Sequence, residues 1–151
     1  MAISKILNMK DCGGHFHGKH LKRALDYVMN PDKTQDGRLV GAINCQVDTA
    51  FEQMKETKRN FGKIDKRQGY HIILSFKENE VNPDTAFEIT QKFVEEYLGK
   101  SYEAVFVVHD NTAHVHSHIV FNSVSFVDGK KYRYEKGDWA KYIQPITNRL
   151  C

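Results

Sequence analysis

The chain has 151 residues, of which 40% are hydrophobic and 27% are charged, and this composition is typical of one folded domain and excludes a disordered or fibrous chain. No apolar run is long enough to span a membrane, and the first ten residues lack the apolar centre of a signal peptide, so we expect a cytoplasmic protein without membrane insertion. The net charge of +3 permits a nucleic-acid partner but does not by itself indicate one.

The cysteines and the end of the chain bear on its compartment and its boundaries. Cys12, Cys45 and Cys151 are odd in number and form no Cys-x-x-Cys pair, so we expect free thiols in a reducing compartment. Cys151 follows a helix-like stretch that has no stop signal. We therefore expect residues 1–151 to be one domain, taken from the N-terminal part of a longer protein.

The first half of the chain predicts two strands and two helices. Partial alternation predicts a strand from Ile3 to Met9. Apolar residues at i, i+3, i+4 and i+7 predict a helix from Leu21 that ends near Asn30, because the following proline disfavours helical geometry. A short extended segment from Gly41 to Val47 comes next, and then a helix from Asp48, its predicted cap, to beyond Lys58.

The second half predicts a further helix and a β-hairpin. Tyr70 to Phe76 is rich in β-forming residues. Asn82 followed by proline predicts the cap of a helix that Gly99 ends. Two strands joined by a short turn predict an antiparallel hairpin, with strands from Ala104 to His109 and from His114 to Phe126. The remaining predicted elements are a short strand at 132–134 and a helix that begins near Asp138.

Four of the eight histidines lie within ten residues, at positions 109, 114, 116 and 118. On a strand, side chains alternate between faces, so His114, His116 and His118 are predicted to share one face. His109 ends the preceding strand and can reach across the hairpin. Neutral imidazoles are ligands for divalent metals, so this spacing predicts a metal site. The residues alone leave open which histidines bind the metal and which substrate it acts on.

Two basic clusters predict either a phosphate-binding surface or a solvated face, which salt-dependent binding would distinguish. One runs from Lys55 to Arg67 and includes Lys58, and the other runs from Lys130 to Lys141. From the second cluster, the candidate DNA contacts are Lys130, Lys131 and Arg133. A further histidine group, His15, His17 and His20, lies in a glycine-rich loop and is interpreted as solvated.

Three segments, in this order along the chain, resemble one known family. The histidine pattern of residues 109–118, followed by Ile-Val-Phe-Asn, resembles the histidine motif of MobP-class conjugative relaxases, which are members of the HUH endonuclease superfamily. Residues 21–34, Leu-Lys-Arg-Ala-Leu-Asp-Tyr-Val-Met-Asn-Pro-Asp-Lys-Thr, resemble the segment that carries the catalytic tyrosine. Residues 70–77, Tyr-His-Ile-Ile-Leu-Ser-Phe-Lys, resemble the motif whose serine lies beside the DNA near the scissile site.

The resemblance implies a fold and an activity. The fold would be α+β in two layers, with a central antiparallel sheet of about five strands flanked by helices and with the histidines on a central strand. The activity would be site- and strand-specific nicking and rejoining of DNA at an origin of transfer, for conjugation or mobilisation. A covalent 5′-phosphotyrosyl intermediate would form and leave a free 3′-hydroxyl.

The resemblance also implies a cofactor and partners. The cofactor would be a divalent metal, Mg²⁺ or Mn²⁺, with Zn²⁺, Ni²⁺ or Co²⁺ as alternatives in a crystal. The partners would be single-stranded and supercoiled DNA at the origin of transfer, accessory relaxosome proteins and a coupling protein.

The resemblance assigns Tyr27 as the nucleophile, whereas the residues alone favour a half-buried packing tyrosine. It favours His109, His116 and His118 as metal ligands, with His114 as an alternative ligand or proton relay. Many relatives have an acidic residue two positions after the first histidine, where this chain has Asn111.

The acidic partner of a ligand histidine would then be Asp110 or a residue elsewhere. Arg23 shares a helix face with Tyr27 and is a candidate phosphate contact. Ser75 either donates to a phosphate or closes a strand.

Three other functions stay open at this point. A rolling-circle replication initiator has nearly the same chemistry, but its tyrosine follows the histidines, whereas Tyr27 precedes them. A DNA-binding module with a structural metal would show no nicking. A small metallohydrolase would act on a small ester and form no covalent adduct with DNA.

Overall fold

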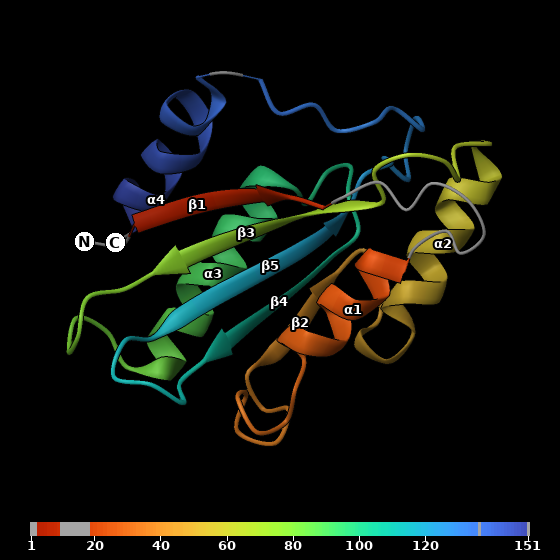
Figure 1. Ribbon diagram of the computed structural model, residues 1–151. Helices are drawn as coiled ribbons and strands as arrows, with labels where there is room; N and C mark the ends of the chain where they lie inside the picture. Colours follow the sequence, from red (N-terminus) through yellow and green to blue (C-terminus); the bar gives the residue numbers. More distant parts are fainter. Residues whose placement is uncertain (1–2, 10–18, 136, 151) are drawn as a thin grey trace.

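The computed structural model describes residues 3–9, 19–135 and 137–150. Its centre is one five-stranded antiparallel sheet with the strand order β1-β3-β5-β4-β2 (Figure 1). The edge strands are β1 (Ile3–Asn8) and β2 (Val40–Ile43). The inner strands are β3 (Gly69–Ser75), β5 (His116–Asn122) and β4 (Ala104–His109). The predicted sheet and the predicted histidines on its central strand are both confirmed.

One face of the sheet is covered by α3 (Pro83–Tyr97) and α4 (Gln144–Leu150). Alternate residues of the inner strands, such as Leu74 and Ile119, pack there against Phe93 of α3 in the larger hydrophobic core. Successive side chains on a strand point to opposite faces, so every second residue of β3, β4 and β5 belongs to this layer.

The opposite face is partly covered by α1 (Lys19–Val28) and α2 (Ala50–Asn60), which Figure 1 shows in front of and beside β4 and β5. Leu21 and Leu25 of α1 pack there against Val107 and Val120 in a second hydrophobic core. The sheet thus has helices on both faces. Helices α1 and α2 form a partial third layer in addition to the two layers that were expected. On the same face, beyond the part that α1 covers, the side chains of β4 and β5 are histidines.

Several element boundaries differ from the sequence prediction. The second hairpin strand begins at His116 rather than His114. Thr49 rather than Asp48 occupies the N-cap position of α2, without a side-chain capping hydrogen bond, because a short 3₁₀ turn, Val47–Thr49, precedes the helix. The last helix begins with a wide π-helical turn, Trp139–Ile143, before α4.

The short strand predicted at 132–134 does not form. One isolated bridge, between Val124 and Lys131, is the pairing found there. Tyr132 instead packs against Tyr70 and Phe121, with ring centroids 4.7 and 4.9 Å away, so its side chain belongs to the core.

No helix within the described ranges is both long enough and apolar enough to cross a membrane. Cys45 has a free thiol, as predicted. Cys12 and Cys151, like His15 and His17, lie outside the described residues.

Candidate active site

Three of the four clustered histidines lie on one face of the β4–β5 hairpin. The register pairs His109 with His116 and Val107 with His118, so alternation brings all three imidazoles to the face that α1 partly covers. The ring centroid of His118 is 4.2 Å from that of His109 and 6.5 Å from that of His116. His114 precedes the strand, and its side chain is exposed.

The end of α1 orients the His109 ring. His109 Nε2 lies 2.8 Å from the carbonyl oxygen of Val28, one of the last-turn carbonyls that has no partner within the helix. Because a carbonyl only accepts, Nε2 is the donor. In the neutral ring the free lone pair is then on Nδ1. Burial lowers the pKa of His109, while the bond to Val28 opposes that shift.

A histidine of the neighbouring strand orients the His118 ring. His71 of β3 places its Nε2 2.8 Å from His118 Nδ1, which leaves Nε2 of His118 free of this bond. Burial, and then the nearby His109, lower the pKa of His118 to about 3 and that of His71 to about 4. Both rings are therefore neutral at physiological pH, the form in which an imidazole binds a metal.

The donor set suits a divalent metal in its chemistry. Three imidazoles share one face, and two of them have the second nitrogen held by a partner, as is usual for metal ligands. Even so, within residues 3–9, 19–135 and 137–150 no three His, Cys, Asp or Glu side chains are grouped closely enough to hold an ion. Metal binding would require the rings to rotate toward one another.

Tyr27 lies beside these histidines. It is the next-to-last residue of α1, and 52% of its surface is exposed. Its ring meets those of His109 and His118 edge-on, with centroid distances of 5.9 and 6.3 Å. Lys33 stands over the same ring, with Nζ 4.0 Å from the centroid.

These side chains line one pocket of about 480 Å³. Its polar lining includes Tyr27, Lys33, Ser75, His109, His116 and His118. Ser75 belongs to the site because it ends β3 directly opposite His116 in the register. The pocket therefore holds a phenol, the ammonium groups of Lys5 and Lys33, the hydroxyls of Ser75 and Thr112, and three imidazoles.

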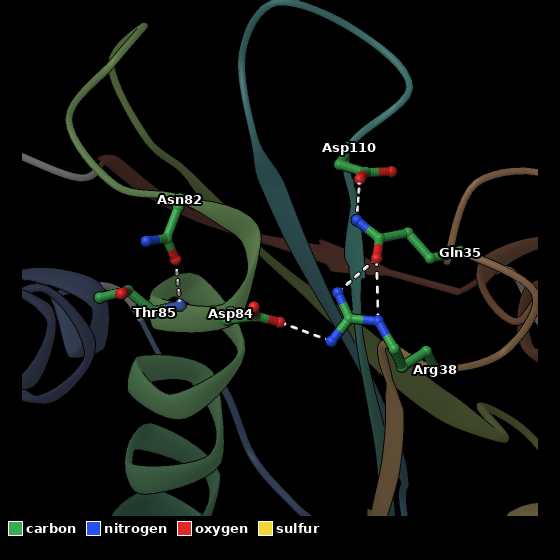
Figure 2. A network of polar contacts seen from close by, with 6 residues as sticks. All are labelled: Gln35, Arg38, Asn82, Asp84, Thr85 and Asp110. Atoms are coloured by element: carbon green, nitrogen blue, oxygen red, sulfur yellow. Dashed lines mark hydrogen bonds and ion pairs between the residues drawn. The ribbon is translucent and has the colours of Figure 1, made fainter.

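Other predicted site residues lie elsewhere. Arg23 lines a separate surface hollow with Lys19 and Lys22, one turn of α1 before Tyr27. The pocket lining does not include His114. Asp110 accepts a hydrogen bond from Gln35 (Figure 2). The partner of the ligand candidate His118 is instead His71.

The predicted DNA contacts of the C-terminal cluster lie in a second hollow of about 710 Å³, which we call the basic groove. Its charged lining is formed by Lys63, Asp65, Lys66, Lys130, Lys131 and Arg133. The groove thus joins both basic clusters of the sequence. Lys58, a buried residue of α2, is not part of this surface, because only 1% of it is exposed.

Two residues of the site were missed or undervalued in the sequence analysis. His71 was not among the predicted site residues, yet it shares a strand face with Ser75 at a spacing of four, a signal that could have placed it near the histidines. Lys33 lies in a turn, where the periodicity of the sequence does not predict the direction in which a side chain points.

Comparisons with known proteins agree on one family. A family model for the MobA/VirD2-like relaxase nuclease domain matches residues 27–151. Protein rlx of Staphylococcus aureus is 33% identical over 118 residues, which are 78% of this chain and 34% of that protein. The group II intron-interrupted relaxase LtrB of Lactococcus lactis subsp. cremoris is 28% identical over 146 residues, covering 80% of this chain and 25% of that protein.

A solved chain from the work "Molecular Basis of Vancomycin Resistance Transfer in Staphylococcus aureus" has a similar fold. The TM-score is 0.58 at 14% sequence identity, and the match covers 99% of this chain and 88% of that chain. Against the curated relatives, the chain spans between 25% and 42% of their length.

Proposed function

This chain belongs to the MobA/VirD2-like relaxase family, and from that premise we propose that it nicks and rejoins one DNA strand at an origin of transfer, with Tyr27 as the nucleophile. The observation that carries this proposal is the placement of Tyr27 in one pocket with His109, His118 and Ser75. These residues come from four different elements, α1, β4, β5 and β3.

The reaction that fits this pocket is a transesterification. The phenol of Tyr27 loses its proton, and its oxygen forms a bond to the scissile phosphorus. The bond between phosphorus and the 3′-oxygen breaks, and its electron pair stays on the 3′-oxygen, which takes up a proton. The product is a 5′-phosphotyrosyl link and a free 3′-hydroxyl. Attack by a 3′-hydroxyl on the same link reverses these steps and rejoins the strand.

We propose that His109, through Nδ1, together with His116 and His118 holds a divalent cation, Mg²⁺ or Mn²⁺. Such an ion neutralises charge on a phosphate and orients it. The exposed position of His114 favours this set over one that includes it. His71 and the Val28 carbonyl keep two of the rings oriented, because each engages the ring nitrogen on the other side.

The DNA would contact this domain in two places. Ser75 is positioned to donate to a phosphate in the pocket, whereas Lys130, Lys131 and Arg133 would bind phosphates in the basic groove. The groove lies at the opposite end of β3 from Ser75, and a seven-residue strand spans roughly 20 Å. Accessory relaxosome proteins and a coupling protein are the partners that the family implies.

A suicide oligonucleotide tests the proposal. The strand is interrupted a short distance upstream of the scissile phosphate, so the short fragment that ends in the 3′-hydroxyl dissociates after cleavage. The covalent adduct is then trapped, and mass spectrometry identifies the attached residue. We expect the adduct at Tyr27. Tyr27→Phe should abolish both nicking and the adduct, while retaining oligonucleotide binding, because it removes one oxygen atom. An adduct that persists in this variant would contradict the assignment of the nucleophile.

A further inference from the structure

Lys33 stands against the proposed nucleophile. Its Nζ lies 4.0 Å from the centre of the Tyr27 ring and lines the same pocket as His109 and His118. We propose that Lys33 is a further catalytic residue, whose ammonium stabilises the negative charge shared by the phenolate oxygen and the scissile phosphate. This inference rests on the proposed nicking activity.

The backbone around Lys33 is tightly held. Its amide donates to the Asn30 carbonyl at 3.0 Å, and its carbonyl accepts from the amide of Asp110 at 3.3 Å, directly after His109. The next residue, Thr34, is fully buried and donates its hydroxyl to Asn30 at 3.0 Å. The turn that carries Lys33 is therefore fastened both to the end of α1 and to the end of the histidine strand β4.

Side chains brace the same turn from outside (Figure 2). Gln35 donates to the Asp110 carboxylate, and Arg38 binds both the Gln35 side-chain oxygen and, at 2.6 Å, Asp84 in the first turn of α3. This network positions the Cα of Lys33 without using its ammonium. The long, flexible side chain can then move from the tyrosine ring to a phosphate that enters the pocket.

The charge balance of the reaction calls for such a cation. A phosphodiester has one negative charge, and attack by a phenolate adds a second to the transition state. Lys33 stays protonated throughout: the proton that leaves the phenol and the proton that the 3′-oxygen takes up are not its own. Arg23, the cation that the sequence placed beside Tyr27, lines another hollow. Lys33 is the side chain whose ammonium contacts the ring.

The test compares Lys33→Met, Lys33→Arg and the control Lys92→Met, an exposed lysine on α3 that is paired with Glu88. Single-turnover cleavage of the suicide oligonucleotide is measured at saturating protein, and rejoining is measured with a second strand. Removal of one transition-state donor lowers rates by about 10²–10³-fold, and we expect this for Lys33→Met. Lys33→Arg should recover most of the rate, and Lys92→Met should match the unaltered chain.

The rates of cleavage and rejoining, together with the oligonucleotide affinity, distinguish a catalytic role of Lys33 from a structural role. A residue that acts on the transition state slows cleavage and rejoining by the same factor, so the ratio of cleaved to rejoined DNA at equilibrium should not change. Oligonucleotide affinity, measured in the Tyr27→Phe background, should change less than the cleavage rate does.

An unchanged saturating rate in Lys33→Met would overturn the inference, as would a loss of rate that a higher protein concentration restores. If Lys33→Met fails to fold, Lys33→Arg and Lys33→Gln decide: equal rates in these two overturn it. A Tyr27→Phe variant that still cleaves would instead overturn the proposed function.

Discussion

At the scale of single residues, the most unusual group outside the pocket is Lys58. It is 1% exposed on α2, donates to Asn122 at the end of β5, and is linked through that amide to Glu103, whose carboxylate lies 3.0 Å from Asn122 Nδ2. Burial lowers the pKa of Lys58 to about 7, although Glu103 opposes the shift. Burial also raises the pKa of Glu103. This buried network joins α2 to the strand that carries His116 and His118.

The shifted pKa of Lys58 predicts a pH-dependent stability. The folded chain holds this proton less tightly, at a pKa of about 7 against 10.5 for an ordinary lysine. Between these values the unfolded chain binds more protons, so the contribution of Lys58 to stability increases as the pH rises and is lost as the pH falls toward 7. We expect the unfolding free energy of the unaltered chain, minus that of Lys58→Met, to rise from about pH 7 to 10 by at most ~1.4 kcal/mol per unit.

Urea unfolding at several pH values measures this difference. Lys92→Met, which alters an exposed lysine, is the matched control and should follow the unaltered chain in parallel. Parallel curves for Lys58→Met as well would mean that Lys58 keeps an ordinary pKa in the folded state.

At the scale of elements, the stability of helix α3 depends on the capping hydrogen bond at its first turn. The Asn82 side chain accepts a hydrogen bond from the Thr85 amide at 2.8 Å, and Pro83 occupies the first helical position. Because α3 supplies Phe93 and Val94 to the larger core, the loss of this cap should destabilise the whole fold.

We expect Asn82→Ala to lower the free energy of unfolding by about 1 kcal/mol, since the Thr85 amide loses its acceptor. For a chain of this size that corresponds to a fall in Tm of roughly 2–4 °C. Calorimetry measures the shift, and Asn82→Asp, which keeps the acceptor, should restore most of it. An Asn82→Ala variant as stable as the unaltered chain would show that the cap bond contributes nothing.

At the scale of the whole molecule, the pocket lined by Tyr27 and the histidines lies at the opposite end of β3 from the basic groove. Phosphate contacts release counterions, so each one steepens the dependence of affinity on salt, by about 0.7 in the log–log slope for single-stranded DNA and 0.9 for duplex DNA. A groove that binds phosphates should therefore be visible in the salt slope even when the chemistry is blocked.

We expect Lys130→Ala combined with Arg133→Ala, in the Tyr27→Phe background, to weaken oligonucleotide binding and to reduce the slope by roughly 1–2. Fluorescence anisotropy across a salt series measures it. The matched control is Lys92→Ala with Arg149→Ala, two exposed cations of α3 and α4 that are paired with carboxylates. If both double variants give the same slope, the groove does not contact DNA.

The sequence by itself determined the elements and the chemistry that they carry. Apolar periods of two and of about 3.6 residues reflect local geometry, so they predicted the α1 helix, the capped α3 and the β4–β5 hairpin. The alternation of side chains on the hairpin strand also predicted that His116 and His118 share a face. The resemblance of residues 21–34 to the tyrosine segment of the family predicted that Tyr27 would lie near these histidines.

Only the tertiary structure decided which distant groups meet. β3 lies between β1 and β5, so His71 reaches His118, and the turn after α1 is fastened to β4, so Lys33 rather than Arg23 stands over Tyr27. The same packing moved Lys58 from an expected basic surface into a buried network. Strand order and turn direction depend on contacts between segments far apart in the chain, and a local pattern has no information about them.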